Sequence, residues 1–441
     1  MIKRFVLLLL CVVMLTWVFA GCTSKPAETG QTTETKEAAE SDTSSDEKAA
    51  EETKPLEAAK LTYYYWNEAQ KEAQDAIYAE FKKAFPQIEV ETTVVPWANY
   101  WTKLQTSLPS GAGPDVYQLN APHAVEYLPA GLAMPLQDKI DAEGLDMSVY
   151  PEAIKNLYTY EGKLYAMPKD YDSIALFYNK AMFDEANVKY PDDTWTWTEF
   201  LDAAKKLTKP DGSQYGFAAD SYAQTGLGNF IFQNGGEFFA ADGMKSAINS
   251  PENIETVQFI SDLMNKYKVS PSYSELVETP SYTLFMGEKV AMITFGSWYV
   301  GPIYEALGDK LGIAPLPMKK TRACVLHGLG YAIDAKTKYP EQAWAFVKFL
   351  ASKQANEIQS SVVIPAYAGM EGKWLEQFPM LDLKVFIDAA KYGKPFPVAL
   401  KNSTAVETAM YNALDKVWNG SMSVEDALKE AEANMNAELS K

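Results

Sequence analysis

Apolar and polar residues recur along positions 61–441 with two spacings, and these predict alternating strands and helices. An apolar, Tyr-rich run at 61–66 predicts a strand, and the alternation at 88–94 predicts a second one. A third strand is expected at 115–119, after a Gly-Ala-Gly-Pro turn signal. The first two strands enclose a predicted amphipathic helix whose apolar residues are four apart: Ala73, Ile77, Phe81 and Phe85.

The later part of the chain repeats this alternation. Its predicted strands lie at 174–178, 216–218 and 290–295, and its predicted helices at 199–207, 252–267 and 340–350. A last helix begins after Ser423 as N-cap, with Asp426 three residues on as a variant of the capping box. Strands that alternate with helices indicate an α/β fold with parallel, doubly wound sheets.

The first residues predict an exported and anchored protein. Two basic residues precede a nearly continuous apolar run at 5–19, which is short of the about 20 residues that span a bilayer. Such a start, followed by small residues, is typical of a secretory signal peptide. The junction before Cys22 resembles a bacterial lipoprotein lipobox, with Phe19 where that pattern usually has Leu. The resemblance implies a signal peptide at 1–21 and a lipid on Cys22; the alternative is an ordinary signal peptide with an incidental cysteine.

The following segment, 22–60, is predicted to be a disordered acidic tether. Residues 23–60 hold ten Asp and Glu against five Lys, and they include no aromatic residue. This composition buries too little apolar surface to offset the entropy of ordering the backbone. With a lipid on Cys22, the expected location is the cell membrane, where the tether holds the folded part on the extracytoplasmic face.

Composition narrows the functions open to residues 61–441. This length suits two or three domain-sized units, at about 150 residues each. The formal net charge of the chain is −18, and most of it lies in this part. An acidic body argues against nucleic acid and anionic lipid as partners. Cys324 is the single cysteine after Cys22, so no disulfide is expected there. Two histidines and no CxxC or HExxH motif leave no basis for a metal site, and no cofactor is expected.

Polar and aromatic residues directly follow three of the predicted strands. Asn67 and Glu68 follow the first strand, Asn120 follows the third, and Trp298 follows the strand at 290–295. In open α/β sheets, ligands bind beyond the carboxyl ends of the strands. Amides and carboxylates bind paired hydroxyl groups, and an indole offers a broad apolar face. Sugars have both polar edges and C–H-rich faces. Taken singly, however, Trp298 is more typical of a core residue and Glu68 of a solvated one.

Several motifs occur in an order that resembles one protein family. The chain contains, in succession, EGKLYAMPKDYDSIALFYNKAMFDEANV, DTWTWTEFLDAAKKL, FQNGGEFF, MGEKVAMITFGSWYVG and HGLGYAIDAKTKYPEQAWAFVKFLAS. Over most of residues 61–441 it resembles extracellular solute-binding proteins of carbohydrate ABC transporters (solute-binding protein family 1), which include maltose-binding proteins. The resemblance implies a two-lobe α/β fold of the periplasmic-binding-protein type II, with each sheet flanked by helices and the ligand cleft between the lobes.

The same resemblance implies how the chain divides. Lobe 1 would comprise 61–169 and 328–365, and lobe 2 would comprise 170–327 and 366–441. The chain would pass between the lobes near Lys169–Tyr171 and near Pro365, which are therefore the expected hinge positions.

The resemblance also assigns ligand-binding roles. Glu68 and Asn67 would bind sugar hydroxyls from the loop after the first strand, and Asn120 would do so from the loop after the third. Asp172 stands seven residues before the Asn of the YN motif, where the family often has an acidic residue that binds hydroxyls. Tyr171 would be its aromatic neighbour.

Trp298 matches the family's stacking aromatic, and His327 lies in the return segment at the edge of the cleft. A second Trp of the family is replaced here by Leu329, which puts a preference for oligosaccharides in doubt. A buried structural imidazole is the alternative for His327.

The implied function is binding without catalysis. The protein, a monomer, would close its lobes over a sugar or oligosaccharide and deliver it to the permease subunits of an ABC importer. Three alternatives stay open. The first is a surface glycosidase that uses Glu68 and Asp172. The second is a polyamine binder with Trp298 in a cation–π site. The third is an adhesin that takes no small ligand.

Overall fold

The computed structural model describes residues 56–441. The predicted signal peptide, Cys22 and nearly all of the predicted tether lie outside the described residues. Within 56–441, none of the helices combines the length and the apolar character needed to cross a bilayer.

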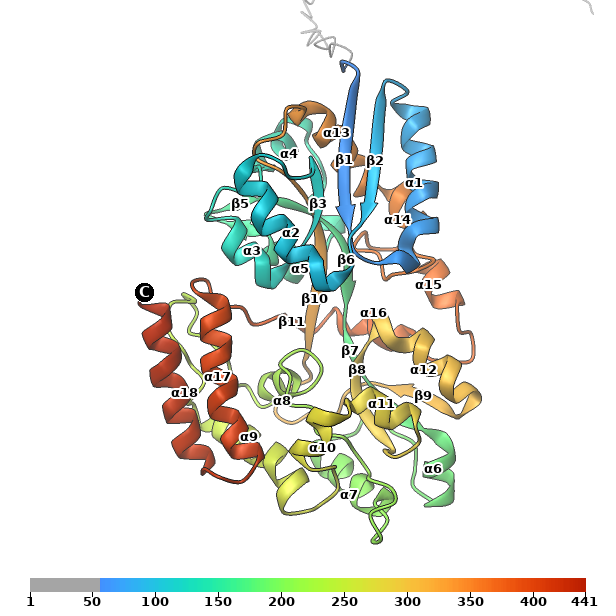
Figure 1. Ribbon diagram of the computed structural model, residues 1–441. Coiled ribbons are helices and arrows are strands. Elements are labelled where there is room, and N and C mark those ends of the chain that lie inside the picture. Colours follow the sequence, from blue (N-terminus) through green and yellow to red (C-terminus); the bar gives the residue numbers. More distant parts are fainter. Residues whose placement is uncertain (1–55) are drawn as a thin grey trace, which may run out of the picture. The chain divides into compact units, whose positions relative to one another are not determined.

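The described chain alternates between strands and helices, as predicted (Figure 1). The strands are β1 (Ala59–Tyr65), β2 (Ile88–Val94), β3 (Val116–Asn120), β4 (Thr159–Tyr160), β5 (Lys163–Leu164), β6 (Ala166–Asp172), β7 (Ile174–Asn179), β8 (Met292–Gly296), β9 (Leu311–Ala314), β10 (Cys324–Ile333) and β11 (Gly393–Pro395). Short 3-10 turns are η1 (Glu68–Gln70), η2 (Met147–Val149), η3 (Ser297–Tyr299) and η4 (Gly308–Lys310).

The helices are α1 (Lys71–Ala84), α2 (Trp97–Ser110), α3 (Ala121–Tyr127), α4 (Gln137–Glu143), α5 (Glu152–Leu157), α6 (Lys180–Glu185), α7 (Trp197–Leu207), α8 (Leu227–Gln233), α9 (Pro251–Asn265), α10 (Tyr273–Glu278), α11 (Ser281–Met286), α12 (Val300–Leu307), α13 (Pro340–Leu350), α14 (Lys353–Gln359), α15 (Gly372–Glu376), α16 (Lys384–Ala389), α17 (Ser403–Trp418) and α18 (Val424–Leu439).

The larger sheet has six strands and is mixed. Its order is β11-β10-β3-β1-β2, and β6 also pairs with β10. As predicted, β1 runs parallel to β2 and to β3. In contrast, β10 runs antiparallel to both β3 and β6. The helix predicted between β1 and β2 packs against this part with the predicted residues: Ala73, Ile77 and Phe81 are buried, and the Phe81 ring centroid lies 4.9 Å from that of Phe346 in α13.

The smaller sheet has the order β8-β7-β9, and both of its pairings are antiparallel. The prediction of parallel pairing is wrong here. Each of these strands is an uninterrupted buried run; such a run indicates burial but carries no information on strand direction. The predicted strand at 216–218 is also absent from the described structure. There Phe217 donates its N–H to Val269 and Ala218 donates to Met292, so the segment has no single partner strand.

Helix starts were predicted well because they depend on local hydrogen bonds. Ser423 caps α18 as expected, with its side chain accepting the N–H of Asp426. The predicted apolar face of this helix is buried. Helix α13 begins at Pro340, where the missing N–H costs no intrahelical bond.

The two sheets are connected through β6 and β10. Ser173 alone separates β6 from β7, so one nearly continuous extended segment serves both sheets. Across from it on β10, Leu329 pairs with Asp170 and Gly330 pairs with Pro168, which leaves Lys169 as the extra residue of a β-bulge. Bulges redirect side chains locally, and this one lies beside the cavity described below.

The two segments predicted to connect the lobes lie side by side. Ala366 donates its N–H to Lys169 O at 3.1 Å, and Tyr171 donates to Ile364 O at 3.1 Å. Asp170 and Pro365 form an isolated bridge between these hydrogen bonds.

Candidate ligand-binding site

A cavity of about 600 Å³ lies beyond the carboxyl ends of strands from both sheets. Its walls include residues at or just after the ends of β1, β3 and β8, together with residues of β6 and β10. This is the position at which α/β sheets bind ligands, and the volume is within the range of small-molecule sites, about 300–1,000 Å³. Five of the seven predicted ligand-binding residues line it: Asn67, Asn120, Asp172, Trp298 and His327.

The structure does not bring Glu68 and Tyr171 to this cavity. Glu68 is exposed as the first residue of η1 and is not among the lining residues. Tyr171 lies between Asp170 and Asp172 in β6, and side chains alternate across a strand. Both aspartates line the cavity, so the Tyr171 ring lies on the opposite face, where it is buried.

The two asparagines at the cavity also cap helical turns. Asn67 Oδ1 accepts the N–H of Ala69 at 3.0 Å and so begins η1. Asn120 Oδ1 accepts the N–H of His123 at 3.2 Å and lies 2.7 Å from His123 Nδ1. The His123 ring in turn stacks on Trp101 at 3.6 Å. These contacts fix both side chains and leave their amide NH₂ groups as donors to a ligand.

Asp172 presents a carboxyl group whose charge is reduced by its surroundings. Ser297 Oγ donates to Asp172 Oδ1 at 2.7 Å. Burial, and next the charge of Asp170, raise the pKa of Asp172 to about 7, against the opposing effects of Ser297 and Lys169. Asp172 is therefore partly protonated at neutral pH and can either donate to or accept from a hydroxyl group.

This raised pKa predicts a specific pH dependence of stability. Between about pH 4 and pH 7, folded Asp172 holds a proton that the unfolded chain has released, so its contribution to the free energy of unfolding falls as pH rises. Burial lowers the pKa of His123 and of His327 to about 4. The contribution of these two groups to the free energy of unfolding therefore rises with pH, opposite to that of Asp172. The measurement is therefore a comparison of the wild type with Asp172→Asn by urea unfolding across this range. A stability difference that is constant from pH 4 to pH 7 would contradict the raised pKa.

Trp298 presents its indole at the cavity wall with 41% of the residue exposed. It lies in η3, directly after Gly296 at the end of β8. A Cβ atom added to Gly296 would lie only 1.8 Å from Cζ3 of the indole. The ring can therefore lie against the strand end because residue 296 has no side chain.

Gly296→Ala is expected to lower the free energy of unfolding by about 1–3 kcal/mol, because the ring or the strand end must move. Gly301→Ala is the matched control: its added Cβ meets nothing nearer than Phe378 Cζ, at 3.9 Å. Because Gly301 lies in α12, alanine there should be neutral or stabilising by up to about 1 kcal/mol. Urea unfolding of both variants tests this, and equal effects would show that the close approach of Trp298 is unimportant.

His327 is half-buried on β10, opposite Asp172 in the strand register. Its ring packs edge-on against Phe396 at 5.4 Å. Because burial lowers the pKa of His327 to about 4, the imidazole is neutral at pH 7 and offers one donor and one acceptor.

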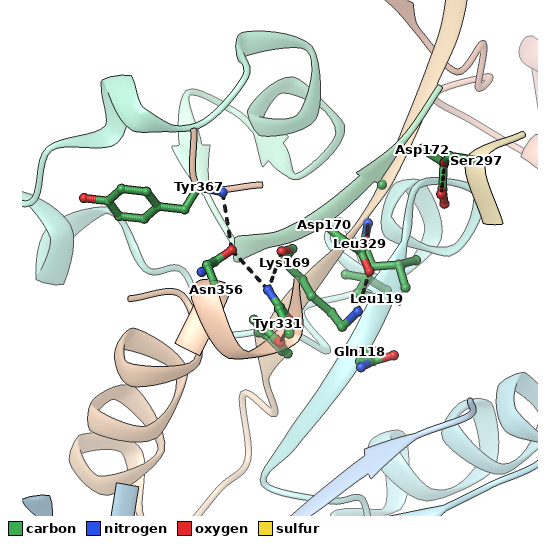
Figure 2. Close-up of polar contacts among 12 residues, drawn as sticks. Gln118, Leu119, Lys169, Asp170, Asp172, Ser297, Leu329, Tyr331, Asn356 and Tyr367 are labelled. Atoms are coloured by element: carbon green, nitrogen blue, oxygen red, sulfur yellow. Dashed lines mark hydrogen bonds and ion pairs between the residues drawn. The ribbon is translucent and has the colours of Figure 1, made fainter. Parts of the chain in front are cut away.

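A buried ion pair includes Asp170, one of the residues that line the cavity (Figure 2). Lys169 Nζ pairs with Asp170 Oδ2, and both side chains are at most 5% exposed. Asp170 Oδ1 accepts the N–H of Leu329 at 3.0 Å. Gln359 Nε2 donates to Lys169 O at 2.8 Å and Gln359 Oε1 accepts from Tyr331. The carboxylate of Asp170 is thus engaged by the protein itself, whereas Asp172 keeps one oxygen, Oδ2, for a ligand.

Sequence reasoning missed several lining residues. They include Trp66, Gln70, Trp97, Asp170, Gln224, Ser297, Trp374 and Phe378. Asp170 had a usable signal, because it shares a strand face with Asp172. Trp66 directly precedes Asn67, and its ring lies 5.2 Å from that of the exposed Trp97. Aromatic faces are therefore present in the same cavity that Leu329 lines.

The arrangement suits recognition of a neutral polar ligand. It combines amide, hydroxyl, imidazole and carboxyl groups with indole faces. Among residues 56–441, no group of three or more His, Cys, Asp and Glu side chains is placed to hold a metal ion. Cys324 is buried, free of a disulfide partner in the described part, and lies away from the cavity lining.

Comparisons with known proteins agree with this geometry. The arabinooligosaccharide-binding protein of Bacillus subtilis is 27% identical over 372 residues, covering 82% of this chain and 79% of that protein. The galactooligosaccharide-binding protein of the same species is 26% identical over 389 residues, covering 83% and 86%. An ABC substrate-binding protein from Listeria monocytogenes, solved in complex with cycloalternan, superposes with a TM-score of 0.76 at 27% identity, covering 86% of this chain and 99% of that one.

These similarities confirm the predicted two-lobe α/β fold. The family profile described as bacterial extracellular solute-binding protein matches residues 65–357, about two thirds of the chain. The chain therefore belongs to the bacterial extracellular solute-binding proteins.

Proposed function

We propose that this protein is the extracytoplasmic substrate-binding component of an ABC importer and that its ligand is a sugar or oligosaccharide. The observation that carries the proposal is the composition of one cavity. Amide groups of Asn67 and Asn120, the carboxyl of Asp172 and the exposed indole of Trp298 line the same space. Relatives named for binding arabinooligosaccharides and galactooligosaccharides support the choice of ligand class.

Each polar group has a definite capacity toward a sugar. The asparagine caps leave NH₂ donors, and neutral His327 adds one donor and one acceptor. Ser297 occupies Asp172 Oδ1 and leaves Oδ2 for a ligand hydroxyl. The Trp298 face provides apolar contact for the C–H groups of a sugar ring.

Binding would be coupled to closure of the lobes. The hydrogen-bonded segments at Lys169–Tyr171 and Pro365 are the proposed hinge, with lobe 1 formed by 61–169 and 328–365 and lobe 2 by 170–327 and 366–441. A ligand favours the closed form only to the extent that it binds that form more tightly. The cavity is lined by residues of both proposed lobes, Asn120 and Trp298 for example, so a bound sugar would stabilise their approach.

Two alternative functions fit the cavity less well. A glycosidase that uses Glu68 with Asp172 would need both carboxyls at the reacting bond, but only Asp172 lines the cavity. A polyamine site would need free carboxylates, yet Asp170 is paired with Lys169 and the pKa of Asp172 is raised to about 7. Both observations favour a neutral ligand and binding without catalysis.

The proposal includes a lipid on Cys22, a monomeric state and delivery to the permease subunits of the importer. The lipid is supported by the sequence pattern at 1–22, and delivery to a permease by the family, whose members are extracellular.

The direct test is a thermal-shift screen of the purified protein against a panel of mono- and oligosaccharides, with spermidine and putrescine as the cationic comparison. A sugar at 100 times its dissociation constant should add about 2.7 kcal/mol to the free energy of unfolding. Stabilisation by polyamines alone, or release of reducing sugar from the oligosaccharides, would overturn the proposal. Small-angle scattering with and without the sugar found would then test closure.

A further inference from the structure

Two hydrogen-bond donors of one histidine converge on the amide oxygen of Asn120. This oxygen, Oδ1, accepts the backbone N–H of His123 at 3.2 Å and lies 2.7 Å from His123 Nδ1. A backbone N–H can only donate, so the atom that it contacts must be the oxygen of the amide. Asn120 lines the cavity, and its NH₂ group makes none of the described hydrogen bonds. The NH₂ group is therefore what this side chain has left for a ligand.

The same contacts determine which nitrogen of the imidazole carries the proton. Burial lowers the pKa of His123 to about 4, so the ring is neutral at pH 7 and has one N–H. Because Asn120 Oδ1 is only an acceptor, that proton must be on Nδ1, and Nε2 is unprotonated. A flipped amide would place its NH₂ group against the backbone N–H and the Nδ1–H together. Donors would then face donors, which excludes the flipped orientation.

The imidazole is itself held by an aromatic cluster. It stacks on Trp101 of α2, which lies beside α3 (Figure 1), with ring centroids 3.6 Å apart and ring planes within 7°. The Trp101 ring also lies 5.6 Å from that of Trp66 and 5.5 Å from that of Trp97. Both of these indoles line the cavity, whereas Trp101 and His123 do not. One packed cluster thus connects the Asn120 amide to an aromatic wall of the same cavity.

We propose that His123, held by Trp101, is a positioning residue of the ligand-binding site: it keeps the Asn120 amide in the single orientation that presents an N–H donor to the ligand. His123 does not line the cavity, so it acts through Asn120. The inference rests on the proposed function and specifies it, because the ligand must offer an oxygen lone pair at this point. Without the imidazole, the amide would be free to rotate and flip, and binding would have to restore its order.

The first experiment determines the tautomer of His123 in the wild-type protein. The chain has two histidines, His123 and His327, so a ¹⁵N-histidine-labelled protein without a histidine tag gives two imidazoles to assign. A His327→Gln variant assigns them. Long-range ¹H–¹⁵N spectra at pH 7 should show His123 with a protonated Nδ1 and an unprotonated Nε2. The opposite tautomer would overturn the proposal, because Nδ1 could not donate to Asn120, and this outcome does not depend on how any variant folds.

The second experiment measures affinity by calorimetry with the sugar found in the thermal-shift screen. His123→Leu keeps the backbone N–H that Asn120 accepts at the start of α3 but removes the ring donor. It should lower the affinity about five- to tenfold. His123→Asn should bind within about threefold of wild type, because its amide nitrogen can take the place of Nδ1 and donate. Equal losses in these two variants would overturn the role assigned to the donated hydrogen bond.

Tyr127→Phe is the packing control for these variants. The Tyr127 ring lies 5.9 Å from that of His123, and its buried hydroxyl has no hydrogen-bond partner in the described part of the chain. The variant changes the same cluster without touching the Asn120 amide, so the affinity should stay within about twofold of wild type. A loss as large as that of His123→Leu would show that packing, and not the hydrogen bond, sets the affinity.

A double-mutant cycle then separates positioning from any other effect of the histidine. Asn120→Ala removes the amide, which leaves His123 with nothing to orient. His123→Leu should therefore change the affinity less than about twofold in that background, against about five- to tenfold in the wild type. Urea unfolding checks that all four proteins are folded. Equal losses in both backgrounds would overturn the inference and leave sugar binding intact, whereas a wild type that binds no sugar would overturn the proposed function.

Discussion

Trp298→Ala should lower the affinity for the sugar by at least about 30-fold, which corresponds to about 2 kcal/mol, while the protein remains folded. The indole is 41% exposed and lines the cavity. Its removal takes away a broad, exposed apolar face that a sugar ring could stack on. Because the ring is partly exposed at the cavity wall, its loss leaves most of the core packing unchanged. Calorimetry with the sugar found in the screen measures the affinity, and urea unfolding measures the fold.

Tyr190→Ala is a suitable control for this variant. Tyr190 is also an exposed aromatic, at 36%, but it does not line the cavity. It should change the affinity less than about twofold, whatever its effect on stability. An unfolded Trp298→Ala protein would assign Trp298 to the core, and unchanged affinity would remove it from the site.

Lys169→Met is expected to lower the free energy of unfolding by about 3–5 kcal/mol. The ammonium group of Lys169 is fully buried, and its partner is Asp170, which is 5% exposed at its side chain. Methionine fills similar space but leaves the Asp170 carboxylate in a low-dielectric environment without its counter-charge. The cost of that unpaired charge is the main part of the expected loss.

Two comparisons isolate this effect in urea unfolding at neutral pH. The double variant Lys169→Met with Asp170→Asn removes both charges and keeps an acceptor for the Leu329 N–H, so it should be more stable than Lys169→Met alone. Lys60→Met breaks the exposed pair with Glu91 and should lower the free energy of unfolding far less than Lys169→Met does. A double variant that is less stable than the single one would contradict the account based on an unpaired charge.

Much of the fold was predictable because it is determined locally. The four-residue spacing from Ala73 to Phe81 places these side chains on one face of a helix, and that face is buried. The Ser423 side chain accepts a backbone N–H of the first turn of α18, which has no partner within the helix. The directions of β7, β8 and β9 were not predictable, because pairing between strands far apart in the chain leaves no trace in a fully buried run.

A position in the cavity was predictable for residues at or just after the carboxyl ends of strands, and Asn67, Asn120 and Trp298 line it. Tyr171 does not line the cavity, because strand alternation places it opposite Asp170 and Asp172. Other lining residues, such as those of α15, come from short irregular segments late in the chain. Only the tertiary fold brings these to the cavity, so no local pattern identifies them.

Asn120 both lines the cavity and caps a helix, and this limits how the protein can acquire a new ligand specificity. The same side chain that lines the cavity begins α3 and holds His123 against Trp101. Replacing it would remove a helix cap at a cost of about 1 kcal/mol, in addition to any change in affinity. The side chains of Gln224 and Gln377, which line the same cavity, take part in none of the described hydrogen bonds. Adaptation to other sugars during evolution, or by directed selection, should therefore proceed first at these two positions.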